Sequence, residues 1–178
     1  RKKLGWNDNR IVGHVGRFSE QKNHKFLVDI ISEMYKKDNS IRAILFGIGE
    51  MREEIIDKVK SMGLEKIIIF PGTSPEINKW LQAIDLFLFP SLYEGLPVAG
   101  IEAQASGVQI LASDTISPEL KITDKIKWMS LKQSANGWAA EALDLIKKQE
   151  NRDTAYEVQQ EGYDIEFTAK KIKEIYES

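Results

Sequence analysis

Cysteine is absent from this 178-residue sequence, which excludes disulfide bonds and thiolate metal sites. Histidine is scarce: there are two, His14 and His24, and neither has a carboxylate or a second histidine at metal-ligand spacing. We therefore expect no metal site and no cofactor. Proteins without cysteine are common in the reducing cytoplasm, which is the compartment we expect.

Long apolar runs are also missing. A helix that crosses a bilayer needs about 20 apolar residues, whereas the longest runs here, 67–71 and 86–90, have the length of a strand. The basic start of the sequence lacks the apolar segment of a signal peptide. It also lacks an initiator Met, so we expect a chain cut from a longer protein.

No block of like charge occurs in the sequence. The 25 Lys and Arg residues nearly balance the 27 Asp and Glu residues, which gives a formal net charge of −2. A sequence-independent nucleic-acid binder needs a basic stripe to neutralise phosphates. We therefore expect no nucleic-acid partner.

The sequence does contain a regular alternation of two kinds of segment. Short β-branched apolar runs end in Gly, Pro, Ser or Asp; they lie at 10–16, 41–47, 66–72, 86–91 and 109–114, with a sixth at 126–131. Between them, apolar residues recur at intervals of three and four, as in Phe26, Ile30 and Met34. This alternation predicts strands separated by helices.

The predicted strands are apolar throughout, so both of their faces must be covered. We therefore predict an α/β fold: a Rossmann-like, doubly wound parallel sheet of about six strands with helices on both faces, plus C-terminal helices. A stripe that includes Trp138 predicts one of these helices, and the last is expected at about 166–176. We expect a single domain over 1–178, with 153–178 as a C-terminal helical appendage.

Ligands of such sheets bind beyond the carboxyl ends of the strands. The first strand ends in Gly16, and Arg17 and Lys22 follow before a helix. Side-chain cations of this kind can neutralise a diphosphate, and surface cations on a loop explain the pattern equally well. The second strand ends with Gly47 and Gly49, which permit a tight turn and close ligand approach.

The fourth strand leads into the strongest feature, in which Pro97 is expected as the first residue of a helix. The amides of Gly95 and Leu96 would then lie at a helix N-terminus that attracts anions. Glu94 would stand in the loop, and Glu102 in the second turn of the helix. These carboxylates are suited to accept hydrogen bonds from sugar and ribose hydroxyls, although a glutamate pair at this spacing is common in ordinary helices.

The sequence resembles the C-terminal domain of family 4 glycosyltransferases with the GT-B fold. The resemblance extends from about Arg10 to the C-terminus, and its most specific segments are GRFSEQKNH (16–24) and LFLFPSLYEGLPVAGIEAQASG (86–107). The intervening ILFGIGE and IIIFPGT segments match as well, and the Glu–seven residues–Glu pattern falls on Glu94 and Glu102. The 21–30 segment is similar to bacterial enzymes of capsule and exopolysaccharide biosynthesis.

This resemblance implies a donor-binding role for a set of residues, three of which would be catalytic: Glu94, Arg17 and Lys22. Arg17 and Lys22 would bind the diphosphate, Glu94 the transferred sugar and Glu102 the ribose. The remaining donor-binding residues would be backbone positions and turns, namely Gly16, Gly47, Gly49, Pro71, Gly72, Thr73, Gly95 and Leu96, of which the turn at 71–73 would flank the base.

The resemblance also implies the reaction, which is a retaining transfer of a sugar from a nucleoside diphosphate sugar, with UDP favoured, without a metal. The acceptor, a polysaccharide or a lipid-linked sugar, would bind an N-terminal domain that this sequence lacks. The fragment alone would then be inactive. The whole enzyme would work in the cytoplasm, at times as a peripheral protein on the inner face of the membrane.

Two other functions remain open, namely another GT-B nucleotide-sugar enzyme such as an epimerase, and a non-catalytic Rossmann-like module that binds a nucleotide or a protein. The second predicts that Arg17, Lys22, Glu94 and Glu102 are scattered.

The sequence also predicts the burial of several side chains outside this set. We expect His14 to be buried and His24 to be exposed. Trp80, Leu81 and Trp138 are expected to be packing residues.

Overall fold

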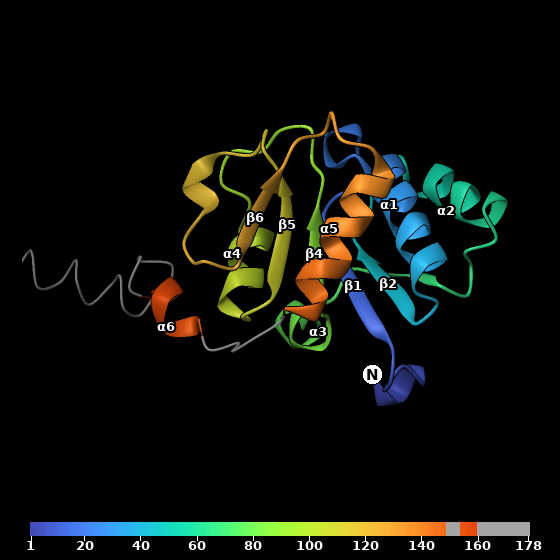
Figure 1. The fold of residues 1–178 in the computed structure, drawn as a ribbon, viewed down its shortest axis with the longest axis horizontal. Helices are drawn as coiled ribbons and strands as arrows, with labels where there is room; N and C mark the ends of the chain where they lie inside the picture. The colour runs from blue at the N-terminus through green and yellow to red at the C-terminus, as the bar shows by residue number, and fades with distance from the viewer. Residues whose placement is uncertain (149–153, 160–178) are drawn as a thin grey trace, which may run out of the picture.

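The computed structural model describes residues 1–148 and 154–159, and its centre is one parallel sheet (Figure 1). Six strands lie in the order β3-β2-β1-β4-β5-β6, and all their pairings are parallel. The strands are β1 (Arg10–Val15), β2 (Ile41–Phe46), β3 (Ile68–Gly72), β4 (Leu86–Phe89), β5 (Gln109–Ser113) and β6 (Ile126–Met129). Each predicted strand is confirmed, with ends that differ by one or two residues.

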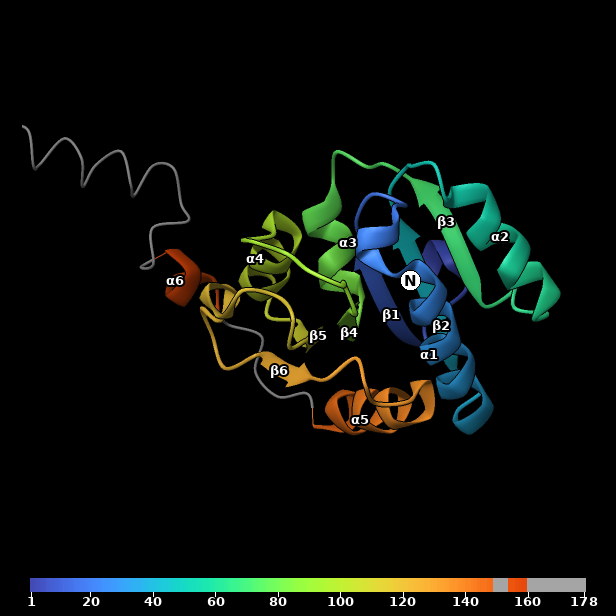
Figure 2. The ribbon, with the colours of Figure 1, turned by 90° about the horizontal axis from the view of Figure 1, so that it is seen from above.

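Helices cover both faces of the sheet, as a view from above makes clear (Figure 2). One face carries α1 (His24–Lys37), α2 (Arg52–Ser61) and α5 (Ala135–Lys147), and the other carries α3 (Ile77–Ala83) and α4 (Val98–Ala105). The described residues also form short 3-10 helices, which are η1 (Lys2–Leu4), η2 (Glu20–Lys22) and η3 (Pro118–Leu120). The predicted doubly wound α/β fold is therefore confirmed.

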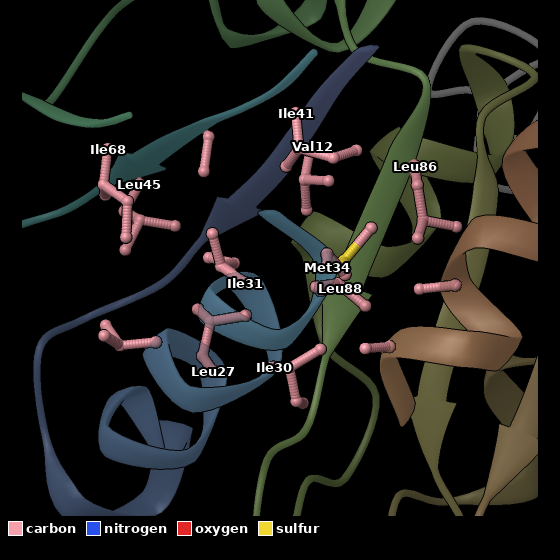
Figure 3. Packing of buried hydrophobic residues seen from close by; sticks show 14 of the residues in the cluster. Val12, Leu27, Ile30, Ile31, Met34, Ile41, Leu45, Ile68, Leu86 and Leu88 are labelled. Atoms are coloured by element: carbon pink, nitrogen blue, oxygen red, sulfur yellow. The ribbon is translucent and has the colours of Figure 1, made fainter. Parts of the chain in front are cut away.

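The core consists of two layers because successive side chains of a strand point to opposite faces. In β4, Leu86 and Leu88 join the layer beneath α1 and α5, whereas Phe87 and Phe89 join the layer beneath α3 and α4. Figure 3 shows the first layer, in which one face of α1, including Met34, lies against the strands. Trp138 of α5 is fully buried in the same layer, as predicted.

Farther along the described part of the chain, α6 (Ala155–Val158) contacts α4. The hydroxyl of Thr154 donates a hydrogen bond to the carbonyl of Gln104 in α4. The helix predicted at about 166–176, and most of the predicted appendage at 153–178, lie outside the described residues. Within the part described, no helix combines the length and the apolar character that crossing a bilayer requires.

The strand order places a switch point between β1 and β4, which are neighbours in the sheet. After β1 the chain runs into α1 on one face, and after β4 it runs into α4 on the other. The two loops leave the sheet from the same edge, at the carboxyl ends of the strands, where α/β sheets bind ligands. These are the β1–α1 loop (residues 16–23) and the β4–α4 loop (residues 90–97).

Candidate binding site at the carboxyl edge of the sheet

Gly16 begins the β1–α1 loop at a crowded position. Its amide donates to the carbonyl of Phe46 (3.0 Å). A Cβ atom at this position would lie 2.9 Å from His14 Nε2 and 3.2 Å from Cδ of Lys22. Glycine therefore allows the Lys22 side chain to pass close to the backbone at the end of β1.

Hydrogen bonds fasten the β1–α1 loop to the β4–α4 loop. The amide of Leu92 donates to the carbonyl of Gln21 (2.8 Å), and Nδ2 of Asn23 donates to the carbonyl of Pro90 (3.1 Å). Asn23 has φ 54°, in the left-handed region that asparagine tolerates better than most residues. The sequence did not predict a role for Gln21 or Asn23, because their hydrogen-bond partners lie more than 60 residues away in the sequence.

Lys22 and Glu94 meet between these two loops. Nζ of Lys22 donates to Oε1 of Glu94, and Nε2 of Gln21 donates to its other oxygen, Oε2 (3.3 Å), and to the carbonyl of Tyr93 (3.0 Å). The Lys22 and Glu94 side chains are only 14% and 8% exposed. The structure thus brings together two of the three residues predicted to be catalytic, as a shielded ion pair.

Arg17, the third, lies on the same loop but has another partner. Its guanidinium donates to Oε2 of Glu50 from Nε (3.2 Å) and Nη2 (3.1 Å). Both side chains are well exposed, so solvent screens the pair and it stabilises the fold little. The backbone N–H of Glu50 itself, together with Arg17, lowers the pKa of the Glu50 carboxyl.

Gly47 and Gly49 allow the loop after β2 to touch the β1–α1 loop. A Cβ atom on Gly47 would lie 1.9 Å from the carbonyl oxygen of Gly16, and one on Gly49 would lie 2.4 Å from that of Phe18. Their φ angles, 137° and 156°, also favour glycine. The structure therefore gives this pair a packing role that holds the neighbouring loop in place.

The turn after β3 reaches the same edge. Gly72, with φ 82°, accepts a hydrogen bond from the amide of Gly47 (2.8 Å), and Pro71 and Thr73 on either side are exposed. Pro71, Gly72 and Thr73 are thus next to the loop after β2. Arg17, Lys22 and Glu94 lie on the loops nearer the switch point.

The prediction for Pro97 was wrong by one residue, because α4 begins at Val98. Pro97 has an extended ψ of 121°, and its carbonyl accepts hydrogen bonds from the amides of Gly100 (3.0 Å) and Ile101 (3.4 Å), so it is the N-cap. In the described part of the chain, the amides that precede and open the helix have no acceptor; these belong to Gly95, Leu96, Val98 and Ala99. Four backbone donors at and just before the start of α4 are therefore without a protein acceptor.

Glu102 lies in the second turn of α4, as predicted. Its side chain is exposed, although partial burial raises the pKa of its carboxyl. Within the described residues the carboxylate of Glu102 has no partner, in contrast to that of Glu94. It is therefore available to accept hydrogen bonds from a ligand.

The prediction that His24 is exposed was wrong: it is 1% exposed. Its ring stacks on Phe18 (centroids 4.1 Å apart) and meets the edge of His14 (4.9 Å), because the β1–α1 loop folds Phe18 over the start of α1. His14 is buried as predicted, and its Nδ1 lies 2.9 Å from the carbonyl of Leu88. Burial lowers the pKa of His14, and burial and Lys22 lower that of His24 to about 4.

An open cavity of about 370 Å³ lies beside the fastened loops. It is lined by residues from both loops, from α1 and from the segment after β2, namely Glu20, Asn23, His24, Lys25, Met51 and Leu92. No group of three His, Cys, Asp or Glu side chains suited to a metal ion occurs in residues 1–148 and 154–159. The chemistry of the edge is that of cations, carboxylates and free amides.

The strand order, the parallel pairings and the helices on both faces define the class: a Rossmann-like α/β domain with a switch point between β1 and β4. The match of residues 1–161 to the model of the glycosyl transferases group 1 family specifies it further. The chain belongs to this family, and the expected resemblance to glycosyltransferases of the GT-B fold is confirmed.

Individual relatives agree with this assignment. The chain is 32% identical over 175 residues to a putative glycosyltransferase EpsF of Bacillus subtilis, covering 95% of the chain and 45% of the relative. It is 31% identical over 171 residues to the capsular polysaccharide biosynthesis glycosyltransferase CapH of Staphylococcus aureus, covering 93% and 47%. The chain therefore spans about half the length of these relatives.

Among solved structures, one of the most similar is that of a point mutant of TarM from S. aureus, in complex with fondaparinux, alpha-GlcNAc-glycerol and UDP. The TM-score is 0.78 at 26% sequence identity, over 96% of this chain and 36% of TarM. The likeness leaves most of TarM unmatched.

Proposed function

We propose that this chain is the donor-binding domain of a retaining glycosyltransferase. The donor would be a nucleoside diphosphate sugar, with UDP favoured, and the acceptor a polysaccharide or a lipid-linked sugar. The observation that carries the proposal is the meeting of Lys22 and Glu94 at the switch point, beside four unpaired amides at the start of α4. A cation, a carboxylate and a helix end together match the diphosphate and the hydroxyls of such a donor.

Each group has a defined task in this proposal. Lys22, Arg17 and the amides of Gly95 and Leu96 bind the diphosphate, Glu94 binds hydroxyls of the sugar, and Glu102 binds the ribose. As the bond between the anomeric carbon and the phosphate oxygen breaks, negative charge grows on the diphosphate. Cations and amides placed there stabilise the transition state more than the ground state.

We propose that configuration is retained because the acceptor attacks from the face that the diphosphate leaves. The acceptor hydroxyl forms the new bond to the anomeric carbon, and its proton passes to the departing phosphate oxygen. Glu94 holds the positively charged, oxocarbenium-like sugar and forms no covalent bond to it. The chemistry needs no metal ion, so chelators should leave the transfer rate unchanged.

Relatives support the remaining parts of the proposal. UDP is bound in the TarM structure, which favours uridine in the donor here. The role of CapH in capsular polysaccharide synthesis favours a saccharide acceptor. Because the chain spans 45% of EpsF, we propose that an additional N-terminal domain binds the acceptor and completes the enzyme. Such an enzyme would act in the cytoplasm, where sugar nucleotides occur, or on the inner face of the membrane.

Calorimetric titration with UDP, GDP and ADP tests the donor site. We expect one diphosphate to bind, and Arg17→Ala and Glu102→Ala each to weaken it by a factor of about 10 to 100, as expected when one charged hydrogen-bond partner of the ligand is lost. Arg42→Ala, at the amino end of β2, is the matched control and should bind as the wild type does. If the full-length protein binds none of the three nucleotides, the proposal is wrong.

A further inference from the structure

The Lys22–Glu94 pair occupies the residues that the donor must use. Lys22 is bound to one carboxylate oxygen of Glu94, and Gln21 is bound to the other. The carboxylate therefore has no oxygen without a protein donor, and the ammonium already has a counter-charge. Because both side chains are also nearly buried, a ligand has little access to either group while these contacts are intact.

Burial makes this replacement selective. With 14% and 8% of the Lys22 and Glu94 side chains exposed, water compensates poorly for a broken contact. When one partner of a shielded ion pair is taken away, the other is left as an uncompensated charge, which is strongly unfavourable. A diphosphate that takes Lys22 therefore isolates Glu94, unless the same ligand also brings hydrogen-bond donors to that carboxylate.

We propose that the donor exchanges partners with the Lys22–Glu94 pair: the diphosphate takes Lys22 while the hydroxyls of the sugar take Glu94. The inference rests on the proposed function and deepens it. A nucleoside diphosphate sugar satisfies both charges, whereas the free nucleoside diphosphate satisfies one. The pair thus favours the substrate over the nucleotide product, and its re-formation after transfer promotes product release.

Arg17 shows by contrast which feature matters. In the Arg17–Glu50 pair, too, a carboxylate neutralises a cation that is predicted to bind the diphosphate. The side chains of this pair, however, are 73% and 60% exposed. Water replaces the lost contact at either group, so the release of Arg17 costs little. Selection for the intact donor therefore belongs to the Lys22–Glu94 pair.

The test is titration of the full-length protein with UDP, GDP and ADP and with UDP-glucose, GDP-mannose and ADP-glucose. We expect Glu94→Gln to bind the free diphosphate about tenfold more tightly than the wild type, because Lys22 no longer has a carboxylate to give up. The sugar nucleotide gains from the freed Lys22 but loses its bonds to a carboxylate. The preference for sugar nucleotide over free diphosphate should therefore fall about tenfold or more.

Glu119→Gln is the matched control, since it removes the same charge from an exposed side chain two residues from Ser117, whose amide donates to the carbonyl of Glu94. We expect it to change the affinity for the diphosphate less than twofold. An equal gain in Glu119→Gln and Glu94→Gln would show general electrostatic attraction and overturn the exchange. Unchanged or weaker diphosphate binding in a folded Glu94→Gln variant would overturn it too, while leaving the proposed function intact.

A structure of the wild-type protein with the free diphosphate decides the case even where the variant does not fold. The exchange requires Nζ of Lys22 within hydrogen-bond distance of a phosphate oxygen and no longer bonded to Glu94. A diphosphate bound while the ion pair stays intact would overturn the inference. If the wild type binds none of the six nucleotides, the proposed function itself is overturned.

Discussion

His14 and His24 form a buried pair next to the loop that carries Lys22. Nδ1 of His14 faces the carbonyl of Leu88, so this nitrogen carries the proton of the neutral ring. Nε2 of His14 and both ring nitrogens of His24 have no hydrogen-bond partner in the described part of the chain. A protonated ring here would be buried without a hydrogen-bond acceptor, and it would also lie near the charge of Lys22.

The pair should make the stability of the fold depend on pH. The pKa of His24 falls from 6.5 in the unfolded chain to about 4 in the fold, because of burial and then Lys22. The unfolded state thus binds the extra proton first, and stability is complete above pH 6.5 and declines as the pH falls towards 4. His24→Phe should remove about 3 kcal/mol of this decline.

Urea unfolding at several pH values between about 7 and 5, a range above that in which most carboxylates titrate, measures about 2 kcal/mol of this difference; the rest of the decline lies between pH 5 and 4. The burial of His14 acts in the same direction, so some decline should remain in the His24→Phe variant. Equal slopes for the wild type and His24→Phe in this interval would contradict the assignment of the effect to His24.

Gly16 should tolerate no side chain, because a Cβ would lie 2.9 Å from His14 Nε2 and 3.2 Å from Lys22. We expect Gly16→Ala to lower the free energy of unfolding by about 1–3 kcal/mol, the usual cost of overpacking, and to weaken nucleotide binding by displacing Lys22. Gly95→Ala is the control for stability, since no atom lies within 4 Å of the position that its Cβ would take. A similar loss of stability in both variants, measured by urea unfolding, would argue against a specific clash.

Secondary elements were more predictable than the contacts between their loops. The strands at 41–46 and 109–113 follow from local apolar runs, and α1 follows from its stripe. The bonds between Gln21 and the β4–α4 loop depend on how β1 and β4 come together, which no local pattern encodes. The burial of His24 likewise depends on Phe18 folding back over it, and sequence alone suggested an exposed helix end.

The sequence also placed the start of α4 one residue too early, at Pro97 instead of Val98. This difference changes which backbone amides are available to a ligand. Because Val98 is the first helical residue, its N–H has no partner within the helix. Proline at this position keeps the helix, since its φ suits the first turn. The extended ψ of Pro97 is also the conformation that a following proline requires. Val98→Pro therefore removes a donor without removing the helix.

If the amides of α4 bind the diphosphate, Val98→Pro should weaken the binding of UDP by about tenfold or more, the loss of one hydrogen bond to a charged group. Val98→Ala keeps the N–H and should bind UDP as the wild type does. Thermal unfolding of both variants checks that the helix persists. Equal UDP affinity for Val98→Pro and Val98→Ala would show that this amide does not contact the ligand.

At the scale of the molecule, the carboxyl edge of the sheet carries most of the large apolar side chains that are exposed in the described structure. They come from the loops after β2 and β4, namely Ile48, Leu92, Tyr93, Leu96 and Val98. Exposed apolar groups gathered at a ligand-binding edge are typical of a surface that another domain covers. This agrees with a chain that spans about half of EpsF and CapH, and with a cleft closed by the proposed second domain.

Donor binding and sugar transfer should therefore separate when the 178-residue chain is compared with the full-length protein. The loops that hold Lys22, Glu94 and α4 are fastened within this chain, so it should bind UDP by itself. At a UDP concentration of about 100 times the dissociation constant, the free energy of unfolding rises by about 2.7 kcal/mol. This corresponds to a melting temperature higher by about 5–10 °C.

Transfer should be at least about a hundredfold slower in the chain alone, because nothing holds the acceptor against the donor. If the chain transfers sugar at the rate of the full-length protein, the acceptor site lies within these 178 residues, and the division between two domains proposed here is wrong.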